Sequence, residues 1–114
     1  MAVAAAAVNV FRTQTIDVGV STVGIYTAPV GYTGVILLSQ VTNTSSETET
    51  IEFGYERENG SRTPIVKDIP VPPNDTVNLL PGKLVVETGD SLTMIGSTSI
   101  GLKYISSILE TSNL

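Results

Sequence analysis

The stretch Ile65–Asp90, IVKDIPVPPNDTVNLLPGKLVVETGD, decides the fold. Two groups of turn residues, PVPPND at 70–75 and PG at 81–82, separate three short apolar runs within it. Because proline has no backbone N–H to donate to a β ladder, residues 70–75 predict a sheet edge or a crossing between two sheets. This alternation of short strands and turns is typical of an antiparallel β-sandwich and predicts that the stretch is scaffold.

The residues on the N-terminal side of this stretch continue the same pattern. The run Val35–Asn43 opens with continuous apolar residues, which predicts a central strand covered on both faces. Thr48–Glu58 alternates apolar and polar residues, so Phe53 and Tyr55 should face the same, buried side. The dipeptide Asn59-Gly60 predicts a type I′ hairpin turn, in which both central residues have positive φ.

The whole chain divides into short strands with turn signals between them, and no segment favours a helix. The sequence therefore predicts an all-β protein, a single antiparallel β-sandwich of immunoglobulin-like or jelly-roll kind. We expect an extended N-terminal arm at residues 1–15 and the sandwich domain at residues 16–114. The predicted strands cover residues 8–15, 21–27, 35–43, 48–58, 62–69, 75–80, 83–86, 91–95 and 100–110.

Composition limits the possible partners. Only 15% of the 114 residues are charged, against about 25% in an average domain, so part of the surface is expected to be covered by other proteins. The net charge of −5 with six basic residues argues against nucleic acid as a partner, because displacing counterions requires clustered Lys and Arg. With no cysteine, stability has to come from packing or assembly.

The N-terminal segment Met1–Val8, MAVAAAAV, is apolar but lacks the basic start of a secretory signal and is too short to span a membrane. We expect no membrane partner. An apolar arm is unfavourable in water, so we expect it to dock on a neighbouring subunit. Its candidate contact residues are Val8, Val10 and Phe11.

The sequence offers little catalytic chemistry. With neither His nor Cys, the usual triads and zinc sites are excluded, and we expect no catalytic, metal-binding or cofactor-binding residues. The acidic residues Asp75, Glu87 and Asp90 of the opening stretch fall in or beside turns without a basic companion. The hairpin 47–62 holds much of the charge and should face outward, as should the loop 28–34. The candidate partner contacts in these segments are Tyr32, Glu47, Glu49, Arg57 and Arg62.

Four motifs occur in a fixed order between residues 24 and 110: YTAPVGYT at 26–33, IPVPPND at 69–75, GKLVVETGD at 82–90 and SSILE at 106–110. In this order they resemble small virion structural proteins of tailed bacteriophages of the marine cyanophage type. The resemblance implies a non-enzymatic β-sandwich present in many copies in the virion, which is assembled in the host cytoplasm. It implies other virion proteins and further copies of the chain as partners. Capsid decoration is the first expectation, and a neck, baseplate or tail-fibre attachment role is the second.

Two further functions remain open. A carbohydrate- or receptor-binding module could use Tyr32 and the hairpin 47–62. A hydrolase could use paired glutamates such as Glu47 and Glu49, since residues i and i+2 of a strand project to one side. A solvated, charge-bearing hairpin explains these glutamates more simply, because opposite charges on paired strands neutralise one another.

Overall fold

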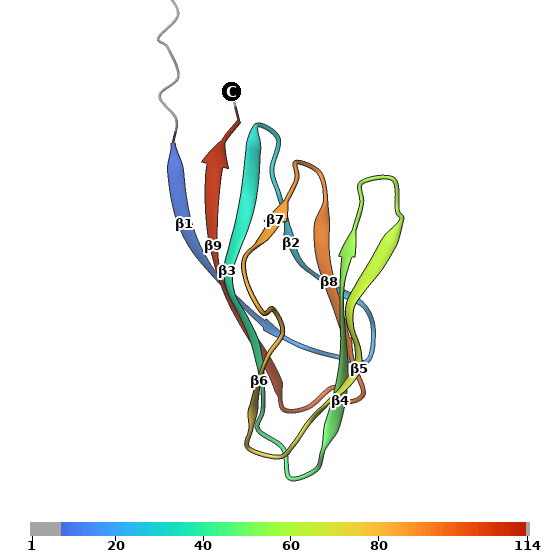
Figure 1. Ribbon diagram of the computed structural model, residues 1–114. Helices are drawn as coiled ribbons and strands as arrows, with labels where there is room; N and C mark the ends of the chain where they lie inside the picture. Colours follow the sequence, from blue (N-terminus) through green and yellow to red (C-terminus); the bar gives the residue numbers. More distant parts are fainter. Residues whose placement is uncertain (1–7, 114) are drawn as a thin grey trace, which may run out of the picture.

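The computed structural model describes residues 8–113, and all regular structure in that part of the chain is β-strand (Figure 1). The predicted all-β class is confirmed. The nine strands are β1 (Asn9–Asp17), β2 (Val23–Thr27), β3 (Tyr32–Asn43), β4 (Glu49–Glu56), β5 (Arg62–Val71), β6 (Thr76–Asn78), β7 (Leu84–Val86), β8 (Ser91–Gly96) and β9 (Leu102–Ser112).

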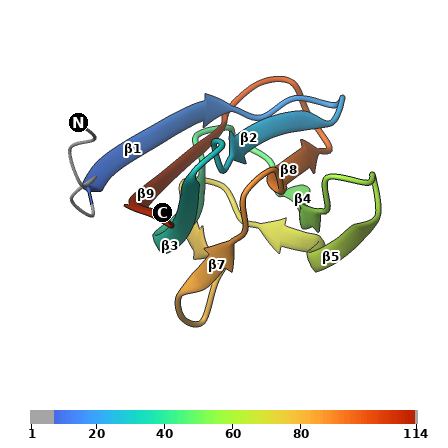
Figure 2. The same ribbon diagram turned by 90° about the horizontal axis from the view of Figure 1, so that it is seen from above.

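The strands form two antiparallel sheets. Sheet A has the order β1-β9-β3, with β6 and β7 pairing with different segments of β3, and sheet B has the order β2-β8-β4-β5. Seen from above in Figure 2, sheet A runs down the left and sheet B down the right. The pairing is nested, because β1 joins β9, β2 joins β8, β3 joins β6 and β7, and β4 joins β5. Of the two expected sandwich forms, this is the jelly roll, in which a long hairpin is rolled up.

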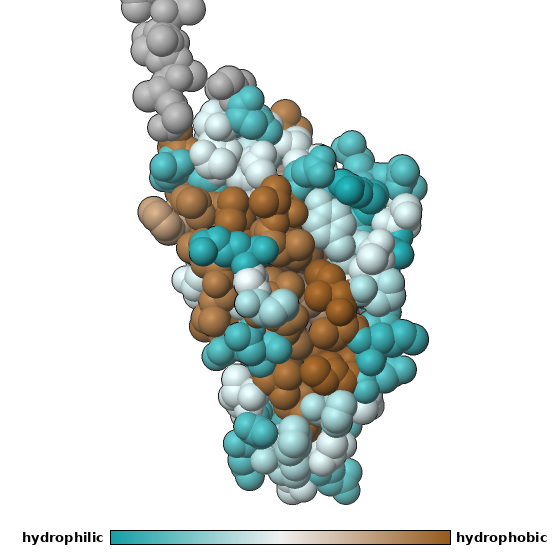
Figure 3. All heavy atoms as spheres, in the orientation of Figure 1, coloured by the Kyte–Doolittle hydropathy of each residue, from teal (hydrophilic) through white to brown (hydrophobic). Residues whose placement is uncertain are grey.

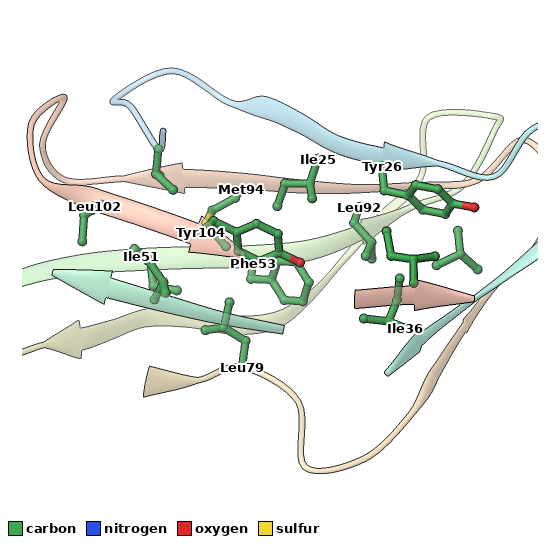
Figure 4. Close-up of a cluster of buried hydrophobic side chains, with 14 of the residues drawn as sticks. Ile25, Tyr26, Ile36, Ile51, Phe53, Leu79, Leu92, Met94, Leu102 and Tyr104 are labelled. Carbon is green, nitrogen blue, oxygen red and sulfur yellow. The ribbon is translucent and has the colours of Figure 1, made fainter. Parts of the chain in front are cut away.

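The core lies between the two sheets and is centred on two aromatic rings. Phe53 of β4 and Tyr104 of β9 have ring centroids 6.0 Å apart, and both are buried. The Tyr104 hydroxyl lies 2.8 Å from the hydroxyl of Ser39 on β3, so the ring brings no unpaired polar atom into the core. Figure 4 shows the aliphatic side chains that surround the rings, among them Ile25, Ile36, Ile51, Leu92, Met94 and Leu102.

The proline-rich segment confirms the predicted crossing. β5 is the edge strand of sheet B and ends at Val71, and residues 72–75 then lead to β6 in sheet A. β5 itself contains Pro64 and Pro70, departs from regular register in two places along β4, and holds Asp68 at a φ of 52°. These features interrupt the row of backbone groups that a free edge would otherwise present.

The predicted hairpin between β4 and β5 forms, but the predicted turn type is wrong. Gly60 has a φ of 93°, whereas Asn59 is not among the residues with positive φ. The Gly60 N–H donates to the carbonyl of Arg57, and the Arg57 N–H donates to the carbonyl of Ser61. This is a longer loop with one left-handed glycine, an arrangement that leaves the residue before glycine in an ordinary conformation.

β3 also differs from its prediction, because only one of its faces is covered. Ile36 and Val41 are buried between the sheets, but Leu37 and Leu38 are exposed. The register shifts between Ile36 and Leu38 where β3 pairs with β9, so the adjacent leucines enlarge the apolar outer surface. Sheet B packs on one face of sheet A only, which is why the apolar run of β3 is not buried on both sides.

β1 is an integral strand of sheet A. It pairs with β9 from Asn9↔Thr111 to Asp17↔Lys103 without a break in register. The boundary expected between an arm at 1–15 and a domain at 16–114 falls inside this strand. The arm prediction for residues 1–7 lies outside the described residues.

We expect Phe53→Ala to lower the free energy of unfolding by about 3–5 kcal/mol, because it removes a ring from the centre of the core and leaves a cavity. Urea denaturation followed by tyrosine fluorescence measures this loss. Val30→Ala is the matched control, since Val30 is 92% exposed and its truncation should change stability by no more than about 0.5 kcal/mol. Equal effects of the two substitutions would contradict this assignment of the core.

Candidate interaction surface

A row of four apolar side chains crosses the outer face of sheet A. Phe11 of β1 pairs in register with Leu109 of β9, Leu109 with Val35 of β3, and Val35 with Val85 of β7. Phe11 is 74% exposed and Val85 is 53% exposed. The residues on either side of Leu109 are the buried Ile108 and Glu110, so strand alternation directs Leu109 outward. We call these four residues the outer row.

The outward side chains of β1, β9 and β3 next to the outer row are uncharged. Lys83 and Glu87 flank β7 with the same strand parity as Val85, and Asp17 and Lys103 pair with each other at 2.9 Å at one end of the sheet. In Figure 3 hydrophobic residues gather across the front of the molecule, over the strands labelled β9, β3 and β7 in Figure 1, with a few hydrophilic residues among them. The outward residues of this face are Phe11, Thr13, Thr15, Val35, Leu38, Gln40, Val85, Ile105, Ser107 and Leu109.

The outer face of sheet B is charged instead. Glu52 of β4 accepts hydrogen bonds from Arg62 and, at 3.0 Å, from Lys67, both on β5. The Arg62 guanidinium also donates to the hydroxyl of Thr93 on β8 at 2.8 Å. The hydrogen bonds from Lys67 and Arg62 lower the pKa of Glu52. A glycosidase acid needs a raised pKa, so this carboxylate is suited to an ion pair and not to acid catalysis.

The four hairpin residues predicted as partner contacts do not form one cluster, and most of them bind other residues of the chain. Arg57 bonds Asp90 at 2.8 Å and Glu87 at 3.1 Å, and Arg62 belongs to the sheet B network. Glu49 accepts a hydrogen bond from the hydroxyl of Ser97 at 2.7 Å. Glu47 is exposed in the turn before β4. The structure thus leaves Glu47 most accessible and engages the other three residues within the chain.

Arg57 also corrects the sequence-based view of the acidic turn residues. Glu87 and Asp90 do have a basic companion, which lies some thirty residues away along the chain. Asp90 is buried and also accepts hydrogen bonds from the Tyr55 hydroxyl and the Glu58 N–H. The bond from Tyr55 is the main reason why the pKa of Asp90 is lowered, and it outweighs the opposing effect of burial. These contacts fasten the β7–β8 turn to the β4–β5 hairpin.

The remaining predicted contacts divide between the two faces of sheet A. Phe11 projects outward, whereas Val10 pairs with Glu110 on the inner side and is half-buried. Val8 is exposed, and its carbonyl accepts a hydrogen bond from the N–H of Ser112. Tyr32 is not in a loop as predicted but begins β3, where it is half-buried.

Glu110, which the sequence did not single out, is a buried carboxylate that joins the two sheets. It accepts a hydrogen bond from Arg12 of β1 at 2.6 Å and one from the Tyr26 hydroxyl of β2 at 2.7 Å. Burial by itself would raise the pKa of Glu110, but the hydrogen bonds from Arg12 and Tyr26 outweigh it, so the pKa is lowered. The sequence could have indicated that Glu110 points inward, because it has the same strand parity as the inward-facing Tyr104 and Ile108.

Asn43, the last residue of β3, is a second buried polar anchor. Its side-chain N–H groups donate to the carbonyls of Val71 at 2.9 Å and Glu47 at 2.7 Å, and its side-chain oxygen accepts from the N–H of Ser45. It therefore ties the end of β3 in sheet A to the end of β5 in sheet B.

Hollows in the surface are shallow and lie mostly at strand edges. One of about 200 Å³ beside the outer row is lined by Leu37, Leu38, Leu80 and Pro81, among others. Among residues 8–113, no three His, Cys, Asp or Glu side chains are grouped so that they could hold a metal ion. The same residues form no helix long and apolar enough to cross a membrane.

Comparison with known proteins identifies the fold. No protein-family model matches the chain, and no curated protein matches its sequence. A solved structure of Bacillus endospore appendages, described as disulfide-linked pili, is 14% identical with a TM-score of 0.57 and covers 95% of this chain and 88% of its own. A structure of infectious bursal disease virus, strain Gx, is 12% identical with a TM-score of 0.52 and covers 94% of this chain. This chain spans only 32% of the viral chain.

We expect Glu110→Gln to destabilise the protein by about 1–3 kcal/mol at pH 7, because it weakens two hydrogen bonds to a buried group. A carboxylate whose pKa is lowered by folding stabilises the fold above its unfolded pKa of about 4.3 and loses that effect as the pH falls through its folded pKa. The difference in the free energy of unfolding between wild type and Glu110→Gln should therefore become smaller below about pH 4. Urea titrations at several pH values between 7 and 3 measure it.

Glu87→Gln is the matched control for this titration, because the side chain of Glu87 is mostly exposed and also pairs with an arginine. Its effect on stability should be close to the experimental error at every pH. A constant difference between wild type and Glu110→Gln from pH 7 to pH 3 would show that the charge of Glu110 is not what stabilises the fold.

Proposed function

We propose that this protein is a non-enzymatic structural subunit of a multi-copy assembly, specifically a capsid decoration or cement protein of a tailed-phage virion. The observation that carries the proposal is the apolar middle of the outer face of sheet A, with Phe11 and Val85 at opposite sides of it. Contiguous apolar surface of this kind marks contact sites in proteins, because exposing it to water is unfavourable.

The comparisons support the structural part of this proposal. The two fold relatives above come from pili and from a virus, and in both settings chains serve as building units of larger particles. The order of the four motifs between residues 24 and 110 supports the phage virion as the setting. In that setting the partners are capsid subunits and further copies of the chain.

The ionisable residues of the described part fit a structural role better than a catalytic one. Glu52, Asp90 and Glu110 each accept at least two hydrogen bonds from Arg, Lys or Tyr side chains, and each has a lowered pKa. Such carboxylates hold segments together, whereas a general acid is kept protonated near neutral pH by a raised pKa. The second placement, at the neck, baseplate or tail-fibre attachment, would use the same outer face.

A carbohydrate-binding role has less support in the geometry. Tyr32, on which that alternative depends, is half-buried at the start of β3, and its carbonyl accepts a hydrogen bond from the Thr88 hydroxyl. A half-buried ring leaves less of its face for a stacked sugar than the exposed loop position expected from the sequence.

The test of the proposed function is the location of the chain after infection. Virus particles purified through a density gradient should contain the chain in tens to hundreds of copies per particle, as measured by quantitative mass spectrometry against the major capsid protein. Electron microscopy should place it on the head. Recovery of the chain only in the soluble fraction of the lysate would rule out a structural role in the virion, and recovery on tails would favour the second placement.

We also expect Phe11→Glu to reduce the particle-bound fraction at least tenfold, because a charge within an apolar contact is costly to desolvate. Ile100→Glu is the matched control, since Ile100 is equally exposed at 74% but lies in the loop before β9. It should bind like wild type. The bound fraction is measured by adding each purified variant to particles that lack the protein.

A further inference from the structure

We infer that the outer face of sheet A packs against the same face of a second copy of this chain, with Phe11 of each copy over Val85 of the other. This inference rests on the proposed structural role and specifies the partner and the contact. It depends on three observations: the uncovered apolar face, the order of strands within that face, and the distribution of charge.

The first observation is that sheet A is built for burial on both sides but is buried on one. The sequence of β3 begins with the continuous apolar run Val35–Leu38, which is typical of a strand covered on both faces. In the single chain Leu37, Leu38 and Val85 are nevertheless exposed. A second layer at the usual sheet spacing of about 10 Å would cover them.

The second observation is that the outer row complements itself. Its residues lie on four neighbouring strands in the order Phe11, Leu109, Val35, Val85. A two-fold axis in the interface, parallel to the strands and between β9 and β3, exchanges the two halves of this row. It places Phe11 over Val85 of the second copy and Leu109 over Val35 of the second copy, as an isologous contact requires.

A hollow beside the outer row fits this arrangement. The depression of about 200 Å³ lined by Leu37, Leu38 and Leu80 lies on the β6–β7 side of the face, and Phe11 projects from the opposite side. The two-fold axis brings the aromatic ring of each copy to the hollow of the other, which is lined by these leucines and also by Asn78 and Lys83. A surface with a projection on one side of its centre and a hollow on the other complements a rotated copy of itself.

The third observation is the charge distribution. Two chains of net charge −5 repel each other, so their closest approach is favoured where neither carries a charge. The part of the outer face of sheet A over the middle of β1, β9 and β3 meets this condition, with Lys83 at its β7 side, whereas the outer face of sheet B carries Glu52, Arg62 and Lys67. Three strands of at least nine residues together with the short β6 and β7 cover roughly 500 Å² per copy, or ~1,000 Å² in total, which is about the smallest size of a specific interface.

Cysteine cross-linking of the full chain tests the predicted contact directly, because the natural sequence contains no cysteine. Phe11→Cys and Val85→Cys proteins are mixed and treated with a short bis-maleimide. The mixture should form a covalent heterodimer. Either variant alone should cross-link at least tenfold less, since the axis separates identical positions by about 14 Å sideways, or three strand spacings.

Val30→Cys and Ile100→Cys are the matched controls, because both residues are at least as exposed as Phe11 but lie in loops. Their mixture should cross-link only at the level of random collision. Cross-linking of the control pair as fast as the Phe11 and Val85 pair, or no cross-linking of the latter, would overturn the inference.

Analytical ultracentrifugation of uncross-linked protein gives an independent measurement. Phe11→Glu with Val85→Glu should weaken dimerisation by roughly 30-fold or more, as expected when two paired apolar contacts are lost. Mixing this variant with one carrying Phe11→Lys and Val85→Lys should restore a dimer, because opposite charges then face each other. Failure to restore it would contradict the pairing of Phe11 with Val85.

The outcomes separate this inference from the proposed function. A chain that is monomeric at all concentrations but present on particles contradicts the inference alone and assigns the face to another virion protein. A chain that forms the predicted dimer but is missing from particles contradicts the virion role and leaves the dimer standing.

Discussion

The structure depends above all on the position of β9, which hydrogen-bonds to β1 on one side and to β3 on the other along nearly its whole length. A strand held on both edges cannot rotate or shift register, so alternation fixes the direction of each of its side chains. Tyr104 and Ile108 then face the core, while Leu109 faces outward. The core and the outer apolar face are two results of the same constraint.

The same constraint directs polar groups into the interior, where they need partners. Glu110 follows Leu109 and points inward, and it is stable there because Arg12 and Tyr26 supply hydrogen bonds from β1 and β2. At the end of β3, the side chain of Asn43 likewise joins the two sheets by donating a hydrogen bond to the carbonyl of Val71. Buried polar groups without such partners would cost free energy, so these contacts fix how the two sheets are placed relative to each other.

Local patterns were enough to predict the strands, the sandwich and the proline-rich crossing, because turn chemistry and strand alternation act over a few residues. The choice of a jelly roll depends on pairing between the two ends of the chain, which no local pattern encodes. The ion pair of Arg57 with Asp90 was missed for the same reason. The dipeptide Asn59-Gly60 predicted the wrong turn type, because the hairpin closes with only Gly60 in the left-handed region. Phe11 was a candidate contact from the apolar start of the chain, but its alignment with Leu109 and Val35 required the sheet.

The irregular edge of sheet B has a consequence for the size of any assembly. Pro64, Pro70 and the left-handed Asp68 prevent β5 from serving as a template on which further strands could add. Addition of strands at an edge has no natural end and leads to fibres, whereas a two-fold contact through a flat face is complete after two chains. The prolines of β5 therefore work against open-ended growth of the sheet through this edge.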